Sequence, residues 1–196
     1  MADMQQPTQT PVPEAETAEA QGEKKKKSLG REIFEWVMVV VVAVAAALLI
    51  RTFIFEPVRV DGESMINTLQ DGEYMIVTKY DYWLGDPERF DIVICNYPNR
   101  GMTNFVKRIV GLPGDEVAVS GGVLYLNGEA VDEPYIDYPP YYTLDPLIVP
   151  EGQYYVLGDN RASSNDSHSV GPLQRSQIKG HVRLVAWPFS DFRTVE

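Results

Sequence analysis

The chain has 196 residues, 44% of them hydrophobic, and a formal net charge of −11. The length suits one folded domain with appendages, and the acidic charge argues against a nucleic-acid-binding protein. Its single cysteine, Cys95, excludes an intrachain disulfide and a cysteine-rich metal site. Within "DIVICNY" we interpret Cys95 as a small buried apolar residue.

Residues 1–31 are predicted to be a disordered tail that ends in a basic cluster. Residues 1–23 are rich in Pro, Gln, Thr, Ala and Glu and contain no aromatic residue. Such a segment cannot bury enough apolar surface to offset the loss of chain entropy. Lys24–Lys27 form the basic cluster, and Arg31 follows closely.

Residues 32–55 are predicted to form a transmembrane helix. Residues 36–50 carry no charge, and apolar neighbours extend the segment to the roughly 20 residues that a bilayer-spanning helix needs. A cleaved signal peptide is the alternative, because Ala45–Ala47 could supply a cleavage site. Those alanines lie inside the apolar segment, however, and a long tail precedes it. We therefore expect an uncleaved anchor.

The positions of the basic residues predict how this anchor is oriented. Positive charges concentrate before the helix, and the positive-inside rule places that side in the cytoplasm. We expect a single-pass protein of the cell (plasma) membrane, in contact with the lipid bilayer. Its N-terminus would be cytoplasmic and residues 56–196 would form an extracytoplasmic domain.

Residues 56–196 are predicted to be mainly β, because short β-branched segments alternate with Gly, Pro and Asp. "GVLYLNGEAV" predicts a hairpin with a type I′ turn at Asn127–Gly128. Helical periodicity is absent, apart from single turns expected at 64–69 and 172–176. The other expected strands lie in "EPVRVDG", "EYMIVTKY", "RFDIVICNY", "NFVKRIVG", "DEVAVS", "GQYYVLGD" and "GHVRLVAW".

The segment "VDGESMINTL" raises the question of whether Ser64 is a nucleophile. A serine hydroxyl needs a base to remove its proton. The chain has two histidines, His168 and His181, and neither lies in a recognisable catalytic sequence. A lysine that burial keeps neutral is the other known solution.

Lys107 is the candidate base. In "NFVKRIVG" the two-residue period of a strand places Lys107 between Phe105 and Ile109 on one face. From the pattern alone, an exposed lysine at a strand edge is the more common explanation. Lys79, after "MIVT", has fewer apolar neighbours.

Four motifs follow the apolar segment in order: "GESMINTL", "RFDIV", "FVKRIVGLPGD" and "GDNRASSNDSHSVG". Together they closely resemble type I (leader) signal peptidases of the bacterial kind, from about residue 32 to 188. These are membrane-anchored serine endopeptidases that remove N-terminal signal peptides from exported proteins. The resemblance implies an antiparallel β domain with a coiled, partly barrel-like core, Ser64 as nucleophile, Lys107 as general base, and neither cofactor nor metal.

The resemblance also assigns supporting residues. Ser164 matches a serine that hydrogen-bonds the lysine, and Asp166 matches a structural acid near the site. The backbone N–H of Ser64 would be one oxyanion donor. Some members supply a second donor from a serine where this chain has Gly62. Two further departures are Asn67 in place of a proline after the nucleophile and His168 in place of an arginine.

The implied substrates are the signal peptides of exported preproteins, bound by β-strand addition. Shallow apolar pockets would hold alanine-sized residues at the first and third positions before the cut. For each valine taken singly, an ordinary core position is the more common explanation. The residues expected to line these pockets are Val58, Val60, Met65, Leu69, Phe105 and Val106.

The main alternative is an anchored β module that binds secreted peptides without cutting them. Ser64→Ala would separate the two, because a binding module does not need the hydroxyl. A sortase-like enzyme would need a reactive cysteine, and Cys95 lies in an apparently buried strand. A self-cleaving repressor-type protease has the same dyad but no anchor, and a metalloprotease is disfavoured by the absence of H-E-x-x-H. The sequence does not predict an oligomeric state.

Overall fold

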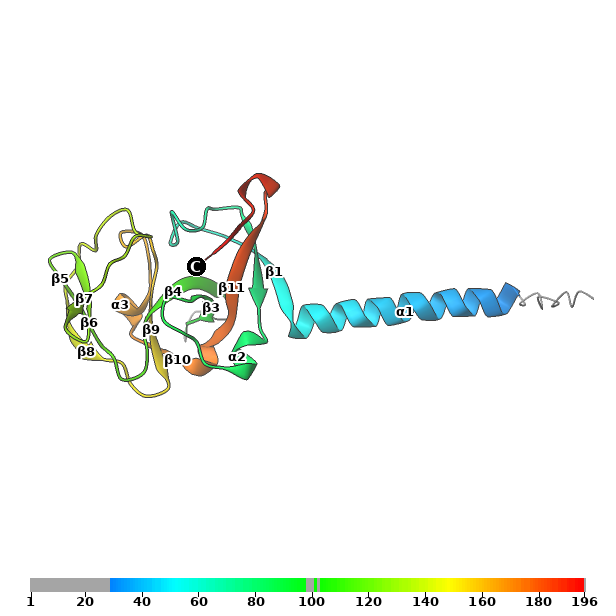
Figure 1. Ribbon diagram of the computed structural model, residues 1–196, viewed down its shortest axis with the longest axis horizontal. Helices are drawn as coiled ribbons and strands as arrows, with labels where there is room; N and C mark the ends of the chain where they lie inside the picture. The colour runs from blue at the N-terminus through cyan, green and yellow to red at the C-terminus, as the bar shows by residue number, and fades with distance from the viewer. Residues whose placement is uncertain (1–28, 98–100, 102, 196) are drawn as a thin grey trace, which may run out of the picture. The chain divides into compact units, whose positions relative to one another are not determined.

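The computed structural model describes residues 29–97, 101 and 103–195, apart from the Thr52 side chain. The predictions for residues 1–28, including Lys24–Lys27, lie outside this range. Helix α1 (Leu29–Phe53) has 25 residues (Figure 1). An 18-residue window within its Leu29–Arg51 stretch has a mean hydropathy of 2.7, and the stretch is long and apolar enough to cross a membrane. The helix begins three residues before the start of the predicted segment 32–55 and ends two residues before the end of that segment.

The larger sheet has eight strands, and all its described pairs are antiparallel. Seven of the strands lie side by side in the order β1 (Phe55–Arg59), β2 (Tyr74–Thr78), β11 (Ile178–Trp187), β3 (Ile92–Asn96), β4 (Asn104–Gly111), β9 (Gln153–Leu157) and β10 (Leu173–Gln174). The eighth strand, β12 (Arg193–Thr194), also pairs with β11. The sheet curls into a half-barrel, so the expected mainly antiparallel, partly barrel-like fold is confirmed.

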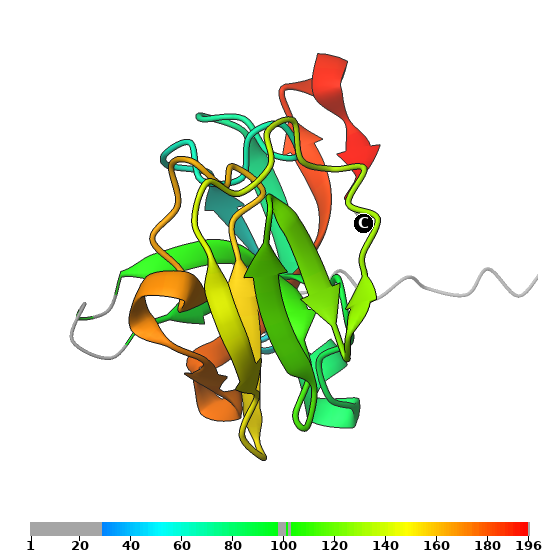
Figure 2. The same cartoon turned by 90° about the vertical axis from the view of Figure 1, so that its left-hand side faces the viewer.

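The smaller sheet is also antiparallel, and its strands gather at one end of the domain (Figures 1 and 2). The predicted hairpin is confirmed: Asn127 and Gly128, with φ of 54° and 82°, join two of its strands. These positive angles match the type I′ turn expected from Asn-Gly. The order is β7 (Glu129–Ala130), β6 (Val123–Leu126), β5 (Glu116–Ser120) and β8 (Leu144–Ile148).

Short helices interrupt the strands. Segment 64–69 forms hydrogen-bonded turns, as in the bond from Leu69 N to Met65 O at 2.9 Å. Segment 172–176 is instead strand β10 followed by the first residues of a 3₁₀ helix. Neither four-residue α-helix was predicted. The four short helices are α2 (Asp81–Leu84), α3 (Ser167–Val170), η1 (Arg175–Gln177) and η2 (Phe189–Asp191).

Three apolar clusters fill the domain, and β4 contributes to each of them. Val106 packs against the first cluster, which contains Met65 and Leu69. Phe105 packs against the second, which contains Cys95, and Val110 belongs to the third. Alternate side chains of β4 therefore enter different clusters, as the pleat of a strand requires. Cys95 is fully buried, which confirms its interpretation as a core residue.

Candidate active site

Ser64 lies in the folded-back segment between β1 and β2. Hydrogen bonds from Val60 N to Glu73 O (2.7 Å) and from Gly72 N to Val60 O (3.0 Å) close this segment at its base. Gly62 has φ of +104°, a conformation that glycine adopts without steric cost. Met65, directly after the serine, is buried in the first apolar cluster. The chain is therefore fixed both before and after Ser64, which is half-buried.

Lys107 meets Ser64 from strand β4. Its Nζ lies 2.8 Å from Ser64 Oγ and 2.8 Å from the carbonyl oxygen of Val106. Strand β4 lies between β3 and β9, and Lys107 is only 1% exposed. The alternative of an exposed lysine at a strand edge is therefore excluded.

Burial lowers the pKa of Lys107 below the usual lysine value, because the charged ammonium loses its hydration. Cys95, Asp166 and Asp159 act in the opposite direction, and more weakly. Burial also raises the pKa of the Cys95 thiol to about 12, so this neighbour carries no charge near neutral pH. The site therefore favours a neutral amine beside the serine hydroxyl.

The segment after β9 passes close to the nucleophile because Gly158 has no side chain. A Cβ at this position would lie against the Ser164 hydroxyl and 2.5 Å from the carbonyl oxygen of Ser64. The Ser164 Oγ is buried and has no hydrogen-bond partner within the described residues, so the expected bond to Lys107 is not formed. Ser164 nevertheless lies beside the Ser64 backbone, across Gly158.

Asp166, which is 1% exposed, ties the end of β9 to helix α3. Its carboxylate accepts hydrogen bonds from Gly158 N (2.8 Å) and His168 N (3.2 Å). The His168 Nδ1 atom lies 2.7 Å from the same carboxylate, and the imidazole stacks on Tyr142 with ring centroids 4.4 Å apart. His168 therefore contacts the acid at the position where the resemblance implies an arginine.

A buried ion pair that the sequence reasoning missed supports the nucleophile. Arg108 Nε and Nη2 donate to the two carboxylate oxygens of Asp159 at 3.0 and 2.8 Å, and both side chains are at most 1% exposed. The next residue, Asn160, donates its N–H to Ser64 O (3.1 Å) and its side-chain amide to Glu63 O (3.0 Å). The only sequence signal is that Asp159 and Asn160 lie within the motif "GDNR".

The Ser64 backbone N–H donates to no acceptor within the described part of the chain. It is therefore available to an oxyanion. Gly62, at the position of the second oxyanion donor that the resemblance implies for some members, donates its N–H to Asp71 Oδ1 at 2.9 Å.

A cleft of about 360 Å³ opens beside Ser64. Of the six residues predicted to line substrate pockets, five line this cleft, and the sixth, Leu69, is fully buried in the first cluster. The cleft borders β1, which is an edge strand of the larger sheet and can pair with an added strand. The lining residues are Val58, Arg59, Val60, Asp61, Gly62, Ser64, Met65, Ile94, Thr103, Asn104, Phe105 and Val106.

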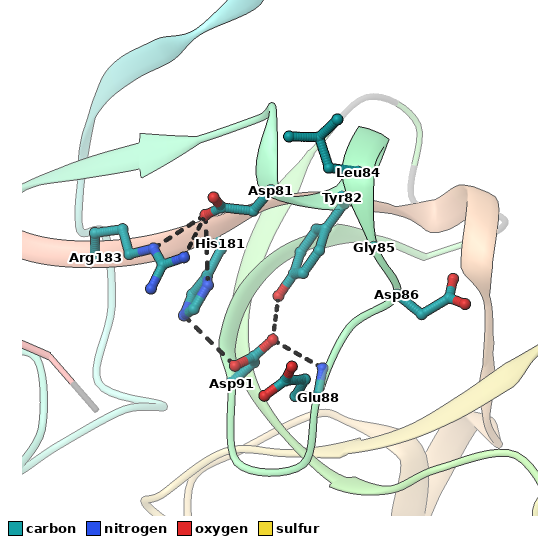
Figure 3. Close-up of a pocket in the computed structure, with 9 residues that line it drawn as sticks. All are labelled: Asp81, Tyr82, Leu84, Gly85, Asp86, Glu88, Asp91, His181 and Arg183. Carbon is teal, nitrogen blue, oxygen red and sulfur yellow. Dashed lines mark hydrogen bonds and ion pairs between the residues drawn. The ribbon is translucent and has the colours of Figure 1, made fainter.

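His181 lies in a separate pocket of about 280 Å³ (Figure 3). Its Nδ1 and Nε2 atoms are 3.6 Å from carboxylate oxygens of Asp81 and Asp91, and its ring stacks on Tyr82. Neither histidine therefore serves as the base for Ser64. Among the residues described, no group of three or more His, Cys, Asp or Glu side chains could hold a metal ion.

The chain is similar to several known proteins. A model of the family described as "Signal peptidase, peptidase S26" matches residues 33–187. A "Signal peptidase I" of Bacillus licheniformis is 38% identical over 89% of this chain and 99% of that protein. The "Signal peptidase I S" of Bacillus subtilis (strain 168) is 42% identical over 86% of this chain and 95% of that protein. A crystal structure of a signal peptidase I from Enterococcus faecalis V583 is 32% identical, covers 50% of this chain and 97% of that chain, and has a TM-score of 0.45.

Proposed function

This chain belongs to the signal peptidase family, peptidase S26, and from that premise we propose that Ser64 and Lys107 form its catalytic dyad. The enzyme would be a membrane-anchored serine endopeptidase that removes N-terminal signal peptides from exported preproteins. The observation that carries the dyad is the 2.8 Å distance between Lys107 Nζ and Ser64 Oγ, at a lysine that is 1% exposed.

The geometry supports a two-step acyl transfer. Neutral Lys107 takes the hydroxyl proton of Ser64 as Oγ forms a bond to the scissile carbonyl carbon. Charge that develops on the carbonyl oxygen is stabilised by the Ser64 N–H. The C–N bond then breaks, and Lys107 returns the proton to the leaving amine. A water that Lys107 deprotonates hydrolyses the acyl-enzyme and regenerates the serine.

The other site residues have supporting roles in this proposal. An extended signal peptide pairs with the edge of β1 and places small side chains in the cleft lined by Val58, Val60, Met65, Phe105 and Val106. Leu69 supports the floor of this cleft from the core. Asp166 orders the segment after β9, which approaches Ser64 at Gly158, and Ser164 packs beside that glycine.

Helix α1 is proposed to be the single membrane anchor. The domain boundaries follow from it: residues 1–31 as a cytoplasmic tail, 32–55 as the anchor, and 56–196 as the extracytoplasmic catalytic domain. This topology places the dyad of a cell-membrane protein on the side where exported chains emerge. The apolar length of α1 and the basic cluster that precedes it support this arrangement.

Cleavage by purified full-length protein in detergent tests the dyad. The substrate is a peptide with alanine at the first and third positions before the cut. Ser64→Ala and Lys107→Met should each reduce turnover to near background, because a dyad acts as a unit. The exposed residues Ser120 and Lys179 provide matched controls, and Ser120→Ala and Lys179→Met should cleave normally. Substantial cleavage by Ser64→Ala would refute the proposal, and peptide binding without any cleavage by the wild type would favour the binding-module alternative.

A further inference from the structure

A second, smaller hollow of about 70 Å³ lies next to the nucleophile. Its lining residues are Ile66, Asp137, Tyr138, Asp159, Asn160 and Arg161. Asn160 connects it to the dyad, because its N–H donates to the carbonyl oxygen of Ser64. The hollow and the larger cleft share no lining residue. The turn formed by residues 64–66 contributes to both and therefore separates them.

The segments that build this hollow come from three distant parts of the chain. Figures 1 and 2 both place the segments between β1 and β2, between β7 and β8, and between β9 and α3 along one edge of the domain. A hydrogen bond from Asn67 Nδ2 to Asp137 Oδ2 joins the first two, and Asn160 joins the third to the first. Asn67 thus fixes Asp137 next to the nucleophile turn.

The position of the hollow matches the path of a substrate beyond the cut. In the proposed function, residues before the cut occupy the larger cleft. Residues after the cut must then leave Ser64 across the turn of residues 64–66. An extended chain rises about 3.3 Å per residue, so only the first two residues after the cut remain close to this turn. A hollow of about 70 Å³ is large enough for the end of one side chain.

The hollow carries one uncompensated negative charge. Asp159 is paired with Arg108, and Arg161, which is 2% exposed, is paired with Glu133 through two hydrogen bonds. These two pairs are each neutral overall. Asp137 is exposed and accepts a hydrogen bond only from the neutral amide of Asn67. No cationic side chain within the described residues lies within ion-pair distance of it.

We propose that this hollow is the subsite for the first residues of the mature chain, and that Asp137 sets its charge preference. The subsite accepts basic and neutral side chains and disfavours acidic ones. The ring of Tyr138, which is 72% exposed, covers the alkyl part of a long basic side chain. This inference rests on the proposed function, because it needs the cut to occur at Ser64.

Peptides that are identical up to the cut test this preference. They carry Lys, Gln or Glu at the first position after the cut or, in a second series, at the second position. In at least one series, kcat/KM of the full-length enzyme should decrease from Lys to Gln to Glu. The Lys and Glu peptides should differ on the order of fivefold, as for partly exposed charge pairs. Added salt should reduce the difference.

Two substitutions of Asp137 assign the preference to that residue. Asp137→Asn keeps an acceptor for the Asn67 amide and should abolish the difference between the Lys and Glu peptides, whereas Asp137→Lys should reverse it. Asp132→Asn is the matched control, because Asp132 is an exposed residue of the same segment that does not line the hollow. It changes the net charge equally and should keep the wild-type preference.

The inference is overturned if the Lys and Glu peptides are cleaved equally well in both series. It is also overturned if Asp137→Asn and Asp137→Lys keep the wild-type order, or if Asp132→Asn loses it. The Gln peptides separate this inference from the proposed function. If the Gln peptides are cleaved in a Ser64-dependent way but the Lys and Glu peptides are cleaved equally well, only the subsite is contradicted. Absence of Ser64-dependent cleavage of every peptide contradicts the proposed function itself.

Discussion

Lys107 and Arg108 are adjacent in β4, equally buried, and have opposite environments. The pleat of the strand directs Arg108 toward Asp159, so its guanidinium has a carboxylate partner. Lys107 faces Ser64 and the Phe105 ring, with Nζ 5.9 Å from the ring centroid. The lysine has no ion-pair partner within the described residues. Arg108 therefore has a structural role in an ion pair, whereas burial of Lys107 favours the neutral amine that a base requires.

The Arg108–Asp159 pair gives a prediction about stability. Asp159→Asn leaves the Arg108 guanidinium buried without a carboxylate, and breaking such a pair typically costs about 3–5 kcal/mol. We expect a loss of this size in the free energy of unfolding, measured by denaturant titration in detergent. Asp86, which is 83% exposed in its ion pair with Arg175, gives the control. Asp86→Asn should leave stability within error, and an equal effect of both substitutions would contradict this account.

At the scale of elements, the strand predictions succeed where both faces of a strand are buried and fail at an exposed sheet edge. The segment "NFVKRIVG" corresponds to β4 residue for residue, because each face of this central strand is buried. Strand β8 was not predicted, since it contains Asp145 and Pro146 and has mostly exposed residues. It lies at the edge of the smaller sheet, where a proline removes no ladder hydrogen bond.

The sequence likewise predicts one part of the candidate site and not the other. Motif order identified Ser64 and Lys107 through a family resemblance, and the structure places their side chains together. Asp159 contacts Arg108, which is 51 residues away, and Asn67 contacts Asp137, which is 70 residues away. Both contacts arise only when the segments pack. Local periodicity contains no information about such distant pairs. The sequence therefore predicts the dyad and Asp166, but not the pairing of Arg108 with Asp159 or of Asn67 with Asp137.

Gly158, at the end of β9, gives a prediction at this scale. In Gly158→Ala the new methyl group would press on the Ser64 carbonyl and the Ser164 hydroxyl, so the nucleophile turn must shift. Displacements approaching 1 Å in an active site cost up to about 100-fold in rate. We expect kcat/KM to decrease roughly 10- to 100-fold. Gly85→Ala is the control, because its new methyl group would meet only Asp81 O at 3.8 Å. Unchanged activity of Gly158→Ala would refute the close approach of this segment.

At the scale of the whole molecule, the proposed anchor predicts a topology. Protease added to the outside of intact cells should degrade the β domain and leave an epitope tag at the N-terminus intact. A tag at the C-terminus should be lost in the same experiment, and a cytoplasmic protein should be protected as a control for cell integrity. Protection of the β domain would mean that the orientation is inverted. The dyad would then lie on the wrong side of the membrane for exported substrates.

The central claim is that Lys107 is a neutral base for Ser64, and the pH at which its amine titrates tests this claim most directly. In the full-length enzyme, ¹³C labelling at lysine Cε gives a signal that Lys107→Met assigns by its disappearance. Burial lowers the pKa of Lys107, so the amine should lose its proton below the ordinary lysine value of 10.5, and activity should increase with pH over that range. A Lys107 signal that titrates at or above 10.5 would show a protonated amine at working pH and would contradict the account.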